Sequence, residues 1–162
     1  MAISSACVWE VRSTGNDANA GGYVTGGIDY SQQDSAQLSL TDVVANGTTT
    51  LTSATSGFTS AMVGNIICLE GGSGSLTRTR RQISSFTNSS TIVVDSIVAS
   101  GTGITGKVGG ALANVGEATA KGATTRNQIW LKYGSYTITD AGTTAGGSCC
   151  INVPATGALR GY

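Results

Sequence analysis

The sequence has no histidine, a single proline and few charged residues, which make up 11% of its 162 positions. Without histidine a Ser-His-Asp triad cannot form, and a structural zinc site is not expected. Basic and acidic residues number nine each, so the formal net charge is zero. Proteins that bind nucleic acids present a basic surface to the phosphates, so we expect no nucleic-acid partner.

Long apolar stretches and export signals are also missing. No segment approaches the ~20 consecutive apolar residues that a membrane-spanning helix needs. The opening segment, Met1–Cys7, lacks the basic start and the continuous apolar run of a secretory signal. We therefore predict a protein that is made in a cytoplasm and has no membrane partner.

Cysteine is scarce, and no two cysteines have the Cys-x-x-Cys spacing of a zinc ligand set. The four residues are Cys7, Cys68 and the adjacent pair Cys149 and Cys150. We expect Cys68 and one residue of the pair to be small buried thiols. A disulfide stays open as an alternative if the protein matures in an oxidising medium. The residues predict neither a metal site nor a cofactor site.

The chain is rich in glycine, with 24 residues, and in serine and threonine, and 40% of its residues are hydrophobic. That hydrophobic share argues against disorder, which requires low hydrophobicity and high net charge. Threonine, valine and isoleucine fit a pleated surface better than a helix. The composition therefore predicts an all-β fold of short strands and tight turns.

Strand and turn patterns divide the chain into three parts. Residues 1–46 hold a first strand, Cys7–Arg12, and an anchoring or loop segment; residues 47–109 form a small β-sandwich or barrel-like module; residues 110–162 follow. The predicted strands of the module are Thr48–Ala54, Ile66–Leu69, Thr79–Phe86 and Thr91–Ile97. Both faces of Ile66–Leu69 are apolar, which predicts a central strand covered on both sides. A unit of ~60 residues is marginal alone, so it should pack against a neighbour.

The third part begins with the one convincing helix, Ala111–Lys121. Its apolar face is predicted to comprise Leu112, Val115, Gly116 and Thr119, with Ala118 beside it. Glu117 and Lys121 have the spacing of a favourable i,i+4 pair, and Gly122 can end the helix.

Short alternating strands follow the helix, at Gln128–Tyr133, Tyr136–Thr139 and Cys149–Val153. Ile129 and Ile151 lie 22 positions apart (151 − 129), which is the length of one solenoid coil. The spacing therefore indicates a β-solenoid.

An asparagine-rich loop, Ser13–Tyr23, carries oxygen-bearing side chains at Asn16, Asp17 and Asn19. They could be calcium ligands, but only one is a carboxylate and no bidentate glutamate follows at EF-hand spacing. We interpret the loop as a turn.

The one basic cluster comprises Arg78, Arg80 and Arg81. We interpret it as solvated charge on an edge strand, where charge opposes aggregation. Nucleic-acid contact is the weaker alternative.

No catalytic centre is predicted, and we expect no enzyme in these residues. The predicted coils carry Lys132, Asp140 and Arg160 but no spaced pair of acids for glycoside hydrolysis. Gly71–Ser75 lacks the Lys-Ser/Thr of a phosphate loop and is predicted to be a hairpin loop.

Six aromatic residues could stack on sugars, although we favour positions in the core or in a subunit interface. These six residues are Trp9, Tyr23, Tyr30, Trp130, Tyr133 and Tyr136.

Two resemblances emerge from these patterns. Ser56–Leu69, Arg81–Phe86 and Thr91–Asp95 follow the order turn, strand, loop, strand, turn, strand. This order resembles a module near the N-terminus of phage fibre, tailspike and other virion proteins. The helix with Ile129–Ile138 resembles the start of a pectate-lyase-like right-handed parallel β-helix, in which an amphipathic helix caps the open end of the coil. This second resemblance covers about 109–162.

The resemblances imply a structural virion protein: a capsid decoration or cement protein, a head fibre, or a tail fibre anchor. They also imply a homotrimer that contacts capsid or tail proteins. A solenoid coil is not stable alone, so the coils continue in a longer chain or are completed between subunits. The alternatives are the non-catalytic start of a β-helical polysaccharide-degrading enzyme or tailspike, and a surface or filament-forming β-solenoid. Carbohydrate stays open as a further partner.

Overall fold

The computed structural model describes residues 7–24, 33–121, 128–132 and 158–161. In these ranges ten strands are accompanied by one short 3-10 helix, η1 (Ser60–Met62), and one α-helix, α1 (Val115–Lys121). The predicted all-β class is therefore confirmed. Several predicted features lie outside the described residues: the strands Tyr136–Thr139 and Cys149–Val153, Gly122, and the side chains of Tyr30, Tyr133, Tyr136 and Asp140.

Six antiparallel strands close into a barrel in the order β3-β4-β7-β6-β5-β8. They are β3 (Leu38–Ala45), β4 (Thr50–Thr52), β5 (Ile66–Gly71), β6 (Leu76–Asn88), β7 (Thr91–Val94) and β8 (Gly101–Val108). Their inward side chains form one apolar core, which includes Leu51, Ile83 and Ile104 at 0% exposure. A turn at Asn46-Gly47 joins β3 to β4, with Gly47 at a φ of +70°, a conformation that glycine adopts at little cost.

All four strands predicted for residues 47–109 are present, with shifted ends. Two barrel strands differ from the prediction. β3 belongs to the barrel although it lies in the segment 1–46, so the predicted boundary falls between the barrel neighbours β3 and β4. β8 was not predicted, because its glycines obscure a strand pattern. Gly106 fits there because a Cβ would approach Val43 Cγ2 to 2.9 Å.

A second sheet, called the base sheet below, has the order β10-β9-β1-β2. Its strands are β1 (Cys7–Val11), β2 (Gly22–Val24), β9 (Gln128–Leu131) and β10 (Ala158–Gly161). β1 and β2 are antiparallel, whereas β1, β9 and β10 run parallel. In this parallel ladder Trp9, Ile129 and Leu159 lie at one level.

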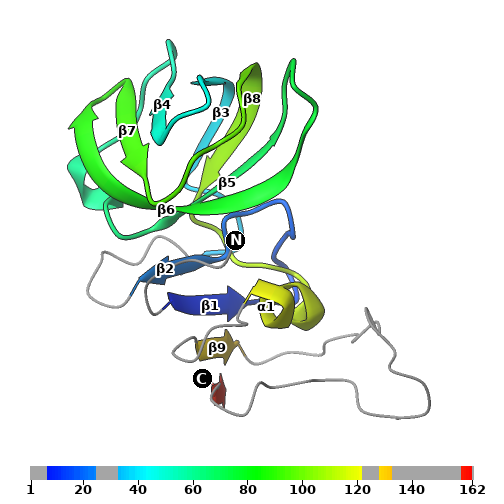
Figure 1. Cartoon of the computed structure of the whole chain (residues 1–162). Coiled ribbons are helices and arrows are strands. Elements are labelled where there is room, and N and C mark those ends of the chain that lie inside the picture. The colour runs from blue at the N-terminus through cyan, green and yellow to red at the C-terminus, as the bar shows by residue number, and fades with distance from the viewer. Residues whose placement is uncertain (1–6, 25–32, 122–127, 133–157, 162) are drawn as a thin grey trace.

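The barrel lies above the base sheet, and α1 lies beside β1 (Figure 1). A second apolar core fills the space between them. It includes Trp9 and Val11 from β1, Ile66 and Cys68 from β5, and Val115 from α1. The predicted covering of Ile66–Leu69 on both sides is therefore confirmed, because Ile67 and Leu69 belong to the barrel core.

The predicted helix start was wrong by four residues, because α1 begins at Val115 rather than Ala111. Leu112 instead extends the parallel pairing with β1: its N–H donates to Glu10 O and its carbonyl accepts from Arg12 N, both at 2.9 Å. Asn114 Oδ1 accepts from Gly116 N at 2.7 Å, which is an N-cap bond and fixes the helix start. Val115 and Ala118 are buried as predicted.

The described strands of the parallel ladder do not have the predicted 22-residue spacing. Ile129 pairs with Trp9 on one side and with Leu159 on the other. Both edges of β9 are therefore occupied at this position, and the next parallel level is Leu159, 30 positions along the chain (159 − 129). Ile151 itself lies outside the described residues.

Candidate functional site

The barrel and the base meet around the buried side chain of Arg80 on β6. Its guanidinium donates to three backbone carbonyls of the loop before β2: Nε to Ala20 O at 3.0 Å, and Nη2 to Asp17 O at 2.6 Å and Asn19 O at 2.8 Å. Nη1 binds Glu117 Oε1 of α1 at 2.6 Å. One side chain thus ties the barrel, the loop and the helix together.

The interpretation of the arginine cluster as charge on an edge strand was therefore wrong for Arg80, whose side chain is 1% exposed. β6 is not an edge, because it pairs with both β5 and β7 in the closed barrel. Arg78 does carry solvated charge, in an exposed ion pair with Glu70 at 2.7 Å, which raises the pKa of Arg78. Arg81 donates to the carbonyls of Arg80 and Ile97.

The asparagine-rich loop is a turn, as predicted. Asn19 N donates to Asn16 O at 2.9 Å, and Asn16 Oδ1 accepts from Ala18 N at 2.8 Å. Asp17 Oδ1 accepts from the backbone N–H groups of Ala113 and Asn114 at 3.0 and 2.9 Å. The carboxylate therefore holds the segment that leads into α1.

Asn19 is a buried polar residue, 3% exposed. Its Nδ2 donates to Asp34 O at 2.7 Å and to Ala111 O at 2.9 Å. Gly110 makes room for this amide: its φ is +77°, and a Cβ there would lie 2.6 Å from Asn19 Nδ2. Arg80 donates to the backbone carbonyls of this same loop. The structure therefore brings together two features that the sequence singled out, the asparagine-rich loop and Arg80 of the basic cluster.

An ion-pair network flanks the same loop. Arg12 Nε donates to Glu10 Oε1 at 2.6 Å, and both side chains are nearly buried. Arg12 Nη1 also reaches Asp34 Oδ1 at 3.3 Å, while Thr14 Oγ1 donates to Asp34 Oδ2 at 2.7 Å. The Thr14 hydroxyl and then Arg12 lower the pKa of Asp34, so this carboxylate is ionised at neutral pH.

Cys7 and Cys68 are both buried free thiols in the core between barrel and base. Burial of Cys68 confirms the prediction, and burial raises the pKa of both thiols. Cys149 and Cys150 lie outside the described residues.

Three of the predicted aromatic residues can be placed. Trp9 is fully buried in the core of the base. Tyr23 and Trp130 are half-buried and meet edge to face, with ring centroids 6.5 Å apart. Trp130 Nε1 also donates to Gln128 Oε1 at 3.2 Å. The preference for a core position is confirmed for Trp9, and Tyr23 and Trp130 pack on each other.

The described part of the chain holds no group of three or more His, Cys, Asp or Glu side chains placed to bind a metal ion. None of its helices is long and apolar enough to cross a membrane. Of the charged residues of the predicted coils, Lys132 follows β9 and Arg160 lies on β10.

Sequence reasoning missed Lys107 on β8. It lines a polar cleft of about 370 Å³ together with residues of the loop and of the segment 34–36. β8 was not predicted as a strand, so nothing in the sequence placed Lys107 beside the loop.

Comparison with known proteins gives no matching family, no matching curated protein and no matching solved structure.

Proposed function

We propose that this chain is a structural protein of a bacteriophage particle. Its barrel and base sheet would form the N-terminal anchor of a fibre or tailspike, or a capsid decoration or cement protein. It would act by packing and subunit association as a homotrimer, and it would contain no catalytic site. Its partners would be its own copies and capsid or tail proteins.

The observation that carries the proposal is the parallel ladder of β1, β9 and β10. Ala158 pairs with Gln128, 30 positions earlier (158 − 128), and Gln128 pairs with Val8. In-register parallel strands separated by 20–50 residues are the repeating unit of a solenoid. In the proposed role the base sheet is the first part of a right-handed parallel β-helix.

The place of α1 supports the same role. Val115 and Ala118 pack into the core that also contains Trp9 and Ile129. A helix in this position covers apolar side chains of the ladder, as the capping helix of a β-helix does in our proposal.

The packed junction between the barrel and the base sheet supports an anchoring role. β5 contributes Ile66 and Cys68 to the core of the base while Ile67 and Leu69 fill the barrel. Arg80 adds four hydrogen bonds across the same boundary. The barrel and the base are therefore joined by apolar packing and by buried hydrogen bonds.

The same ladder suits the alternative roles, the non-catalytic start of a β-helical polysaccharide-degrading enzyme and a surface β-solenoid. The roles differ in where the protein is found. Antibodies against the chain should label purified phage particles from its source, at a regular position on head or tail. Their binding to the bacterial surface alone would contradict the proposal.

The oligomeric state is tested separately, by light scattering after size-exclusion chromatography. We expect a discrete trimer that melts cooperatively, because a single coil buries its apolar face only against neighbours. A monomer whose segment 110–162 is rapidly cleaved by protease would contradict subunit completion.

A further inference from the structure

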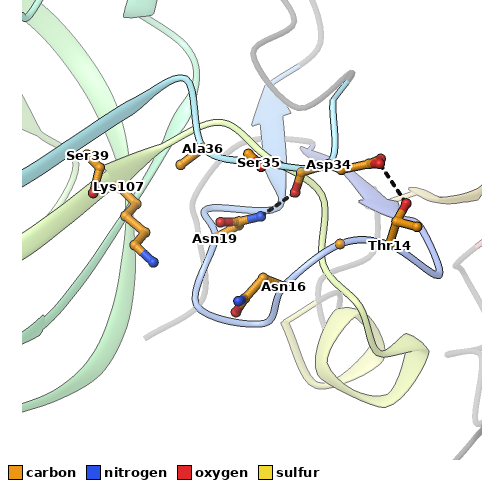
Figure 2. A pocket seen from close by; sticks show the side chains of 9 residues that line it. Thr14, Asn16, Asn19, Asp34, Ser35, Ala36, Ser39 and Lys107 are labelled. Atoms are coloured by element: carbon orange, nitrogen blue, oxygen red, sulfur yellow. Dashed lines mark hydrogen bonds between the residues drawn. The ribbon is translucent and has the colours of Figure 1, made fainter.

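A polar cleft lies where the asparagine-rich loop approaches the barrel wall. Figure 2 shows Lys107 and Ser39 at one end of it, Asp34 and Thr14 at the other, and Asn16 and Asn19 between them. Ser39 and Lys107 are paired across β3 and β8, so their positions are fixed by the barrel. The cleft holds about 370 Å³, enough for a small polar molecule.

The first unusual group in the cleft is the side-chain carbonyl of Asn19. Its amide nitrogen lies within hydrogen-bond distance of two carbonyl oxygens, Asp34 O and Ala111 O, which fixes the orientation of the amide. The oxygen Oδ1 is therefore held in place as an acceptor, on the side facing the cleft (Figure 2). Within the described residues no group donates a hydrogen bond to Asn19 Oδ1. An acceptor on a buried residue favours a ligand that donates a hydrogen bond.

The second unusual group is the ammonium of Lys107. Its side chain is half-buried, and within the described residues it has no ion pair and no hydrogen bond. By contrast, Arg12, Arg78 and Arg80 each pair with a carboxylate. An ammonium at the cleft without a counter-charge favours an anionic ligand at this end of the cleft.

The remaining lining groups are also polar. Asn16 also lines the cleft and uses its Oδ1 within the turn, which leaves its Nδ2 as a donor. Ser35 and Ser39 supply hydroxyls, and Asp34, which shares Arg12 with Glu10, supplies a carboxylate. Because polar atoms make up most of the lining, a lipid or an aromatic ligand would gain less by entering than a polar one.

We propose that this cleft binds a hydroxylated carboxylate, namely a monosaccharide that bears a carboxyl group. Its carboxylate would pair with Lys107 and receive a hydrogen bond from Asn16, and its hydroxyls would donate to Asn19 Oδ1 and Asp34. A simple carboxylate would satisfy Lys107 but leave the Asn19 acceptor without a donor. A neutral sugar would satisfy Asn19 but not Lys107. This inference does not depend on the structural role proposed above.

Binding of sodium glucuronate to the full chain tests the proposal, measured by calorimetry and by the NMR shifts of asparagine side-chain amides. We expect saturable binding that shifts the Asn16 and Asn19 amide signals. Glucose, which lacks the carboxylate, and acetate, which lacks the hydroxyls, should each bind at least about tenfold more weakly.

Two variants locate the site. Lys107→Gln removes the charge, and Ser39→Asp places a carboxylate beside Lys107; each should weaken glucuronate binding about tenfold or more, which is about 1.4 kcal/mol. Both positions are at least partly exposed, and the melting curve verifies folding. The matched control is Arg78→Gln, which removes one positive charge outside the cleft and should leave the affinity within about twofold.

Absence of saturable glucuronate binding would overturn the proposal, as would equal binding by the wild-type protein and both cleft variants. A second outcome would also overturn it: self-association of the chain that Lys107→Gln abolishes. In that case the cleft receives a carboxylate from another copy of the protein rather than from a sugar.

Discussion

Ile67 and Cys68 are consecutive residues of β5, and their side chains belong to two different hydrophobic cores. Ile67 packs inside the barrel, while Cys68 packs against the base sheet and α1. Successive side chains of a strand point to opposite faces, so one strand serves as the wall of both cores. We therefore expect the barrel and the base to unfold together in a single transition.

Replacement of Arg80 should weaken the junction strongly. Arg80→Ala removes the guanidinium that donates to three backbone carbonyls and to Glu117. Breaking a buried, hydrogen-bonded ion pair costs about 3–5 kcal/mol, and we expect about 2–3 kcal/mol here because the Glu117 side chain is 27% exposed. Urea denaturation followed by circular dichroism measures this loss in the free energy of unfolding.

Arg78→Ala is the matched control for Arg80→Ala, since Arg78 lies on the same strand and pairs with Glu70 at the surface. An exposed pair of this kind contributes about 0–1 kcal/mol. Equal destabilisation by the two variants would show that the buried position of Arg80 has no special effect.

Alanine substitutions at Gly110 and Gly71 distinguish the cost of backbone strain from the cost of steric overlap. Both have a positive φ, +77° and +74°, but a Cβ on Gly110 would lie 2.6 Å from Ala36 N and from Asn19 Nδ2, while nothing lies within 4 Å at Gly71. Gly71→Ala should cost about 1–2 kcal/mol, the penalty of the left-handed conformation. Gly110→Ala should cost clearly more, because Asn19 must move. Thermal denaturation of both variants compares them, and similar melting temperatures would contradict the overlap.

Local patterns in the sequence were sufficient to predict the class of fold and the central strand. Ile66–Leu69 has no polar residue on either face because each face is buried in one of the two cores. The alternation of the other barrel strands likewise reflects one buried face. These properties depend only on neighbouring residues, which is why they could be predicted.

Features that depend on distant residues could not be predicted. Arg80 looked like surface charge because the groups that satisfy it, Ala20 O and Glu117, lie 60 and 37 positions away. The start of α1 depends on Asp17, whose carboxylate binds Ala113 N across 96 positions. The cleft beside Lys107 exists only because β8 pairs with β3.

The two described cysteines should be inert until the protein unfolds. Burial raises the pKa of Cys7 and Cys68, so less of each thiol is in the reactive thiolate form at any given pH. In a Cys149→Ala, Cys150→Ala variant, which retains only these two thiols, modification by a disulfide reagent at pH 8 should proceed no faster than unfolding. Fast labelling in the absence of urea would contradict the buried positions.

Asp42 should make the barrel sensitive to acid. Its Oδ1 accepts from Ser53 Oγ at 2.6 Å and its Oδ2 from Thr55 N at 2.7 Å, and the Ser53 hydroxyl is the main cause of a pKa below the ordinary value of 3.8. A carboxylate whose pKa is lower in the folded state contributes stability above its unfolded pKa and loses it as the pH falls through the folded value. Stability should therefore decline below about pH 4. Ser53→Ala should reduce this decline, because it removes the hydrogen bond that contributes most to lowering the pKa of Asp42. The free energy of unfolding, measured from pH 6 to pH 3 for both proteins, tests this. If the two profiles were parallel over that range, the bond from Ser53 would not be what depresses the pKa of Asp42.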